Sequence, residues 1–170
     1  TLRKALELAP ENPDLKRALA QSLLYSDQYD ESLKLYTELI AEDAKDVQSW
    51  LRVSQIHRER RNWEEARKAI NEAKKLEPDN LEIVFNEVGI YEAEGKMAEA
   101  VAGMKNVLDS TAKKSYSASE KANRAILLER LGLLQRSHEQ WADAVATFQE
   151  LAVLDEKNGA RASAQVMDTW

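Results

Sequence analysis

The sequence predicts an all-α protein, a solenoid of stacked antiparallel helix pairs, and three observations lead to this prediction. Five Gly and three Pro among 170 residues are too few to close the many tight turns of a β-protein. Apolar residues recur at intervals of three and four, as in Leu15, Leu19 and Leu23, which is the period of an amphipathic helix. Similar phrases also recur every 34 residues, which indicates a repeat architecture.

The 34-residue period is visible in several independent columns of the sequence. Pro10 and Pro78 lie two periods apart in similar phrases. Three further columns keep the single period: Tyr29, Trp63 and Met97; Ser32, Ala66 and Ala100; Leu39, Ala73 and Val107. The fourth copy comes late, because Trp141 and Ala144 follow Met97 and Ala100 by 44 residues. An insertion of ten residues therefore lies between the third and fourth repeats.

Each period holds two helices, and capping residues mark where they begin. Asn12 before Pro13, and Asn62 with Glu65 three residues on, are typical of helix N-termini. Ser117 and Glu120 have the spacing of a capping box, so we expect the insertion to lengthen a helix by about two turns. The expected helices are 2–9, 13–26, 28–42, 47–60, 63–76, 81–94, 96–112, 117–137, 140–154 and one that starts near 160.

We expect one repeat domain over residues 1–170. Its parts are the end of a preceding repeat (1–12), four repeats (13–46, 47–80, 81–114 and 125–158), the insertion (115–124) and the start of a following repeat (159–170). Both ends are expected to be cut from a longer array, since a repeat buries its apolar face only against its neighbours. Self-association through such cut ends is a possible consequence.

The columns resemble the tetratricopeptide repeat (TPR) family. The family pattern consists of a large residue, a Leu-Gly pair, small alanines, a bulky residue and a closing proline. One copy here resembles it at Trp50, Val53-Ser54, Ala66, Ile70, Ala73 and Pro78. A second copy resembles it at Leu131-Gly132, Ala144, Phe148 and Leu151. His57 departs from the usual Tyr, Glu87 from the usual Leu, and Gly89 comes one place late. The resemblance implies a right-handed superhelix whose first helices line a concave groove.

Composition and motifs argue against most other functions. A net charge of -6 disfavours nucleic acid, and the absence of Cys removes disulfides and thiolate metal sites. No apolar run approaches the roughly 18 residues of a membrane span. Gly89 to Met97 has the wrong spacing and no hydroxyl for a phosphate-binding loop. We therefore expect no catalytic residues, cofactor or metal and no enzyme activity, while cytoplasm and periplasm are both compatible.

Several single residues are better explained by packing than by chemistry. His57 and His138 lie far apart without further His or Cys ligands nearby, so His57 is expected to be a hydrogen-bonded core imidazole rather than a metal ligand. Trp63, Trp141, Met104 and Phe148 are expected in the core.

We expect this chain to be a scaffold that binds a peptide or partner protein in the concave groove. The open alternatives are a structural spacer or assembly subunit of a larger complex, and a non-catalytic region of a larger enzyme or export machine. Chaperone-binding relatives hold a terminal carboxylate with Lys, Asn and Arg, and the matching positions here do not keep that set. By register, the expected partner-binding residues are Arg17, Gln21, Tyr25, Leu51, Arg52, Gln55, Arg58, Phe85, Asn86, Glu129, Arg130 and Leu133.

Overall fold

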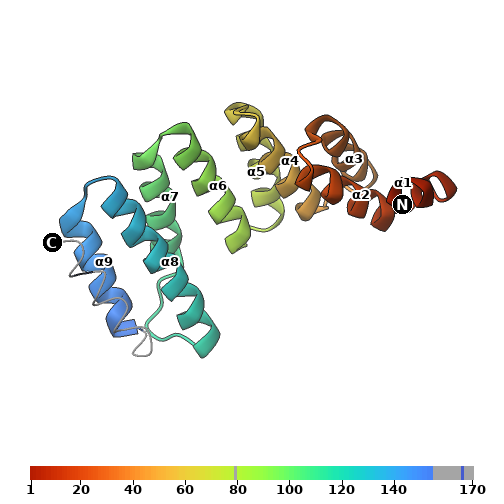
Figure 1. The fold of residues 1–170 in the computed structure, drawn as a ribbon. Helices are drawn as coiled ribbons and strands as arrows, with labels where there is room; N and C mark the ends of the chain where they lie inside the picture. The colour runs from red at the N-terminus through yellow and green to blue at the C-terminus, as the bar shows by residue number, and fades with distance from the viewer. Residues whose placement is uncertain (79, 155–165, 167–170) are drawn as a thin grey trace. The chain divides into compact units, whose positions relative to one another are not determined.

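A computed structural model describes residues 1–78, 80–154 and 166, and within these residues it contains nine helices and no strand (Figure 1). The helices agree with the expected ranges to within two residues at each end. The predicted start of a following repeat, at 159–170, lies outside the described residues apart from residue 166. The helices are α1 (Leu2–Leu8), α2 (Pro13–Tyr25), α3 (Tyr29–Glu42), α4 (Val47–Glu59), α5 (Trp63–Leu76), α6 (Leu81–Glu94), α7 (Met97–Ser110), α8 (Ala118–Ser137) and α9 (Trp141–Leu154).

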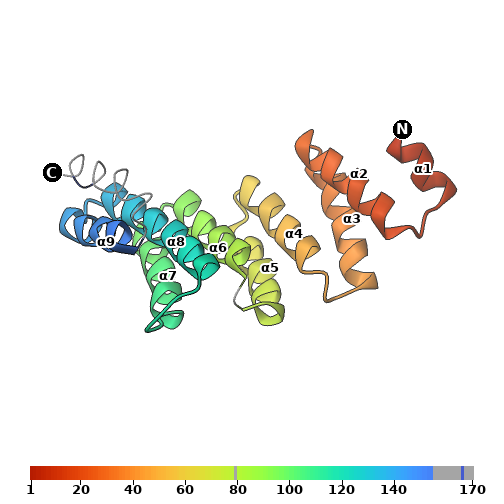
Figure 2. The same cartoon turned by 90° about the horizontal axis from the view of Figure 1, so that it is seen from below.

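The chain divides into two compact units, which we describe separately. The first unit runs from Thr1 to Glu94 and contains α1 to α6. Here α2 packs on α3 and α4 on α5 as helical hairpins, and α3 packs on α4 and α5 on α6 between hairpins. The described part of the second unit contains α7, α8 and α9, and α8 packs against both of its neighbours. Figure 2 shows the hairpins of α2 with α3 and of α8 with α9 from a second side.

Paired helices approach closely where small residues face each other. Ala66 is fully buried and its carbonyl accepts a hydrogen bond of 2.9 Å from Ser54 Oγ of the partner helix. In the preceding hairpin Ser32 Oγ donates to the carbonyl of Ala20 at 2.8 Å. The column of small residues identified in the sequence therefore sets the distance between the two helices of a hairpin.

Large apolar side chains fill the space on either side of this contact. In the first unit Tyr36, Ile56 and Ile70 are almost completely buried. In the second unit Met104 and Phe148 are fully buried, as the sequence predicted. Burial of these side chains supplies most of the stabilising free energy of such a repeat.

The helix starts follow the sequence signals only in part. Asn12 caps α2 as expected, with Oδ1 accepting from the backbone N–H groups of Asp14 and Leu15. Asp46 caps α4 through the N–H of Ser49. The prediction for Asn62 was wrong in detail, because Asn62 is the N-cap of α5 but its side chain makes no capping hydrogen bond.

The capping box at the start of α8 is confirmed. Ser117 Oγ accepts from the N–H of Glu120, and the Glu120 carboxylate accepts from the N–H of Ser117. Ser117 lies seven residues before Arg124, which occupies the column of the helix caps Asn12 and Asp46. Seven of the ten inserted residues therefore add two turns to α8, which spans 20 residues.

Two predictions about buried side chains were wrong. Trp141, the first residue of α9, is 48% exposed rather than part of the core. His57 is only partly buried, and its Nδ1 is shielded from solvent without any hydrogen-bond partner among the described residues. Burial lowers the pKa of His57, which favours the neutral imidazole.

Replacing Ala66 by Trp should destabilise the protein, because the fully buried methyl group has no space around it for an indole. We expect a loss of about 1 to 3 kcal/mol and a lower Tm by circular dichroism. Lys68→Trp, at an exposed position of the same helix, is the control and should change stability by less than about 0.5 kcal/mol. Equal melting curves for both variants would contradict the assigned helix contact.

The start of α8 should weaken as pH falls. The hydrogen bond from Lys113 Nζ, at 2.5 Å, and those from Ser117 lower the pKa of Glu120 to about 2. The folded-state pKa lies below the unfolded value of about 4.3, so this stabilisation is complete above that pH and is lost as pH falls toward 2. A carboxyl NMR titration should give a low midpoint for Glu120 that rises in Lys113→Met and stays unchanged in Lys114→Met.

Candidate functional site

The first unit contains eight of the predicted partner-binding residues that the structure keeps as candidates; Leu51 is excluded below. We call them the first-helix face, since they lie on the first helices of three successive repeats. They are Arg17, Gln21 and Tyr25 on α2, Arg52, Gln55 and Arg58 on α4, and Phe85 and Asn86 on α6. The helices α4 and α6 contact each other, so the five residues that they carry lie on neighbouring helices.

Arg17 connects the first two repeats. Its Nη2 donates to Asp46 Oδ2 at 2.8 Å, and Asp46 also accepts from the hydroxyl and the N–H of Ser49. Burial alone would raise the pKa of Asp46, but the hydrogen bonds from Ser49 and Arg17 outweigh it, so the pKa of Asp46 is lowered. Arg17 is thus held in a contact between α2 and the start of α4, and it contributes to the array as well as to the face.

Arg52 on α4 has two polar neighbours, Gln55 and Glu82. Its Nη1 donates to Gln55 Oε1 at 3.1 Å, while its Nη2 is 3.7 Å from Glu82 on α6. Gln48 donates to the same Glu82 at 3.3 Å across one repeat period. The side chain of Arg52 remains 30% exposed, so a carboxylate from a partner can approach it in place of Glu82.

Arg58 lies against α6 at the position where that helix has a glycine. A Cβ atom built on Gly89 would lie 2.9 Å from Arg58 Nη1. The other terminal nitrogen, Nη2, donates to Glu59 at 3.0 Å. The glycine that comes one place late in the repeat pattern therefore makes room for the Arg58 guanidinium on the neighbouring helix, which the sequence alone did not indicate.

Two aromatic side chains belong to the first-helix face. Tyr25 on α2 is 81% exposed, and Phe85 on α6 is partly buried. Gln21 accepts a hydrogen bond from Tyr36 Oη at 3.1 Å, and Asn86 Nδ2 donates to the carbonyl of Glu82 at 2.9 Å. The face thus combines guanidinium groups, carboxamides and aromatic rings, which are side chains enriched where proteins bind other proteins.

Leu51 does not belong to this face. It is fully buried and packs with Ile70 and Ile83 in the core between α4, α5 and α6. Successive residues of an α-helix point about 100° apart around its axis, so the Leu51 side chain faces the core although Arg52 faces solvent. Leu51 is therefore removed from the set of candidate partner-binding residues.

The other three candidates lie on α8, in the second unit. Glu129, Arg130 and Leu133 are partly buried there, and Glu129 and Arg130 both take part in further interactions. They share one side of α8, since they are spaced by one, three and four residues. They remain predicted contact residues of the second unit.

Two other kinds of functional feature are a metal site and a membrane-spanning helix. No group of three or more His, Asp or Glu side chains within them could hold a metal ion. None of the helices that the structure describes is both long and apolar enough to cross a membrane.

Comparison with known proteins identifies the family. The model of the tetratricopeptide repeat matches residues 17–80 and 55–103, which together span just over half of the chain. The chain therefore belongs to the TPR family, whose members serve as scaffolds for protein–protein interaction. This confirms the resemblance that the sequence columns predicted.

Solved structures of TPR proteins share the fold. MamA has a TM-score of 0.69 at 14% identity, covering 94% of this chain and 87% of its own. YrrB, described as a TPR protein with an unusual peptide-binding site, has a TM-score of 0.63 at 13% identity, covering 99% and 81%. TTC0263, a TPR protein of Thermus thermophilus, has a TM-score of 0.63 at 17% identity, covering 98% and 87%. No curated protein sequence matches the chain.

Gly89→Ala should stabilise the protein while displacing Arg58. Alanine is favoured over glycine inside a helix by roughly 0.5 to 1 kcal/mol, and only the flexible end of Arg58 must move. We expect a higher Tm and a changed NMR signal of the Arg58 guanidinium. Gly132→Ala is the contrasting variant, because its Cβ would lie 2.4 Å from the buried ring of Phe148, so its Tm should fall. A lower Tm for Gly89→Ala would show that Gly89 has a packing role instead.

Proposed function

We propose that this TPR protein binds a peptide or an extended segment of a partner protein along the first-helix face. The observation that carries the proposal is the line Arg52, Gln55 and Arg58 on α4, spaced by three residues so that all lie on one side of the helix. Both guanidinium groups are partly exposed, and their acidic neighbours are themselves surface residues that an incoming carboxylate can replace.

Aromatic and amide groups on the neighbouring helices support a peptide rather than a lone anion. Phe85 and Tyr25 provide apolar surface for a partner's side chains, while Gln55 and Asn86 provide hydrogen-bonding groups for a peptide backbone. The preferred ligand therefore carries an acidic residue next to a large apolar side chain. The peptide-binding site named for YrrB is consistent with this use of the fold, although that protein is only 13% identical.

The test is a variant that removes the charged and aromatic groups together. Peptides would first be selected against the unaltered chain from a random displayed library, and their Kd values measured by fluorescence polarisation. In Arg52→Ala/Arg58→Ala/Phe85→Ala we expect affinity to fall by more than about tenfold, equivalent to about 1.4 kcal/mol, with little change in Tm.

The matched control changes two cations on second helices, Lys34→Ala/Lys68→Ala. These side chains are exposed on α3 and α5, and the control should bind the selected peptides normally. Peptides that bind the triple variant as well as the unaltered chain would contradict the proposed face. They would favour the alternative in which the array acts as a spacer or assembly subunit through its other surfaces.

A further inference from the structure

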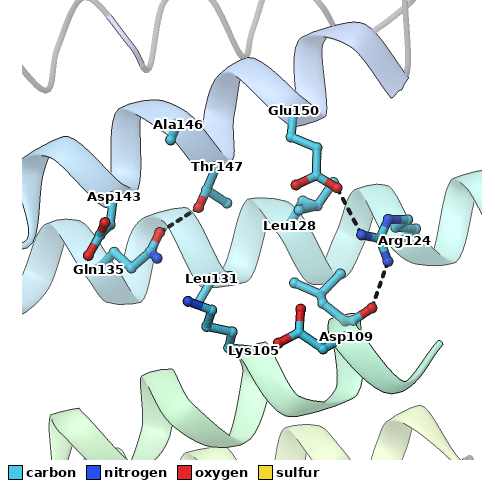
Figure 3. A pocket seen from close by; sticks show the side chains of 11 residues that line it. Lys105, Asp109, Arg124, Leu128, Leu131, Gln135, Asp143, Ala146, Thr147 and Glu150 are labelled. Atoms are coloured by element: carbon cyan, nitrogen blue, oxygen red, sulfur yellow. Dashed lines mark hydrogen bonds and ion pairs between the residues drawn. The ribbon is translucent and has the colours of Figure 1, made fainter. Parts of the chain in front are cut away.

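The second unit contains a crevice on a different side of α8 from the predicted contact residues. It has a volume of about 180 Å³ and lies between α7, α8 and α9 (Figure 3). Its floor is formed by Leu108, Leu128 and Leu131. The α8 residues that line it are four, three and four residues apart, so they form one stripe of the helix, distinct from Glu129, Arg130 and Leu133.

The repeat period explains why this crevice is open. Leu128 occupies the same column as Trp50 in the second repeat, 78 residues earlier. The Trp50 indole packs against two core clusters of the first unit, and its Nε1 donates to the carbonyl of Ala44 in the loop before α4. A leucine is smaller than an indole and cannot make that hydrogen bond. Leu128 therefore fills less space in this column than Trp50 does in the second repeat.

The first repeat shows that a lysine can occupy this column. Lys16 stands there, one period before Trp50, and its side chain is only 8% exposed. Its stem is buried while its ammonium group pairs with Glu42 on the second helix of the hairpin and lies 3.8 Å from Glu11. The fold thus accommodates an aliphatic stem at this place when a carboxylate on a second helix meets the ammonium group.

The charged side chains around the crevice favour a cation. Three carboxylates line it, Asp109 on α7 and Asp143 and Glu150 on α9, against Lys105 and Arg124. Arg124 is already engaged, with Nη2 donating to Glu150 at 2.8 Å and Nη1 to the carbonyl of Leu108 at 2.9 Å (Figure 3). Asp109 and Asp143 make no ion pair within the described part of the chain, so one carboxylate remains in excess even after Lys105 is counted.

A buried amide adds a second, independent feature. Gln135 is only 5% exposed and lines the crevice, and the Thr147 hydroxyl donates to its Oε1 at 2.7 Å. No protein partner within the described residues satisfies the amide nitrogen. The Thr147 hydroxyl can donate as well as accept, so it also forms a hydrogen bond when the Gln135 amide is rotated by half a turn. In that orientation Gln135 Oε1 faces the crevice and can accept from a cationic donor. The free end of this amide is not among the buried atoms that lack a partner, so it is open to the crevice and can bond to a ligand there.

We propose that the crevice between α7, α8 and α9 is a second binding site, which takes a lysine side chain from a partner protein. The aliphatic stem lies on Leu128 and Leu131, and the ammonium group reaches Asp109, Asp143 and the Gln135 amide. The site differs in place and in charge preference from the first-helix face, so either site can fail its test without the other.

The experiment is an NMR titration of the whole chain with the peptide acetyl-Gly-Gly-Lys-Gly-Gly-amide. The same peptide with norleucine in place of lysine has a comparable stem without the ammonium group. We expect the lysine peptide to shift the signals of Thr147, Ala146 and the Gln135 side-chain amide, with millimolar affinity, and the norleucine peptide to bind at least about fivefold more weakly.

Two variants and one control test the residues. Asp109→Asn/Asp143→Asn removes the carboxylates, and Ala146→Trp covers the opening from an exposed position, so both variants are expected to fold. Each should weaken the lysine peptide by at least about fivefold. Glu99→Gln, an exposed acid on α7 outside the crevice, should leave binding unchanged. Equal binding of the norleucine peptide, or shifts that persist in both variants, would overturn the proposal.

Discussion

The close approach of the two helices in each hairpin is the constraint on which the rest of the structure depends. Ser54 donates to the carbonyl of Ala66, and a Cβ atom on Gly132 would lie only 2.4 Å from the Phe148 ring, so the paired helices are in close contact at both places. This contact fixes both the distance and the rotation of the paired helices. The rotation of each first helix decides which of its sides is buried and which side meets solvent. It therefore also decides which residues are available to a partner.

Contacts between successive repeats use the polar residues that remain. Arg17 with Asp46 joins the first repeat to the second, and Glu82 accepts from Gln48 and lies near Arg52 across the next boundary. Such pairs are partly exposed and contribute modestly to stability, so their larger effect is to hold side chains in defined positions. The same residues that align neighbouring helices therefore present guanidinium groups at the surface. The proposed binding face therefore needs no separate loop or domain.

The insertion changes the last repeat more than its length suggests. It moves the start of α8 from the column of Asn12 and Asp46 back to Ser117, so that Arg124 stands inside a helix where other repeats have a cap. Inside the helix, Arg124 reaches the end of α7 and also Glu150 on α9. Its guanidinium carbon lies 5.3 Å from the centre of the Tyr116 ring. The longer helix thus connects α7, α8 and α9 at one end of the crevice. The proposed lysine site depends on this arrangement as well as on the small size of Leu128.

The sequence by itself determined the features that are local or periodic. The 34-residue period, the small residues at Ser32 and Ala66, and the capping box at Ser117 each depend on spacing along one chain, so they could be predicted without a structure. The tertiary structure decided the features that depend on neighbours from other helices. Leu51 is buried although it adjoins the exposed Arg52, because the rotation of α4 turns it toward Ile70 and Ile83. Likewise, only the packing of α6 shows that Gly89 makes room for Arg58, and only the assembly of α7, α8 and α9 leaves a crevice beside Leu128. Spacing specifies which side of a helix a residue occupies, but the space left around its side chain is set by residues that are distant in the sequence.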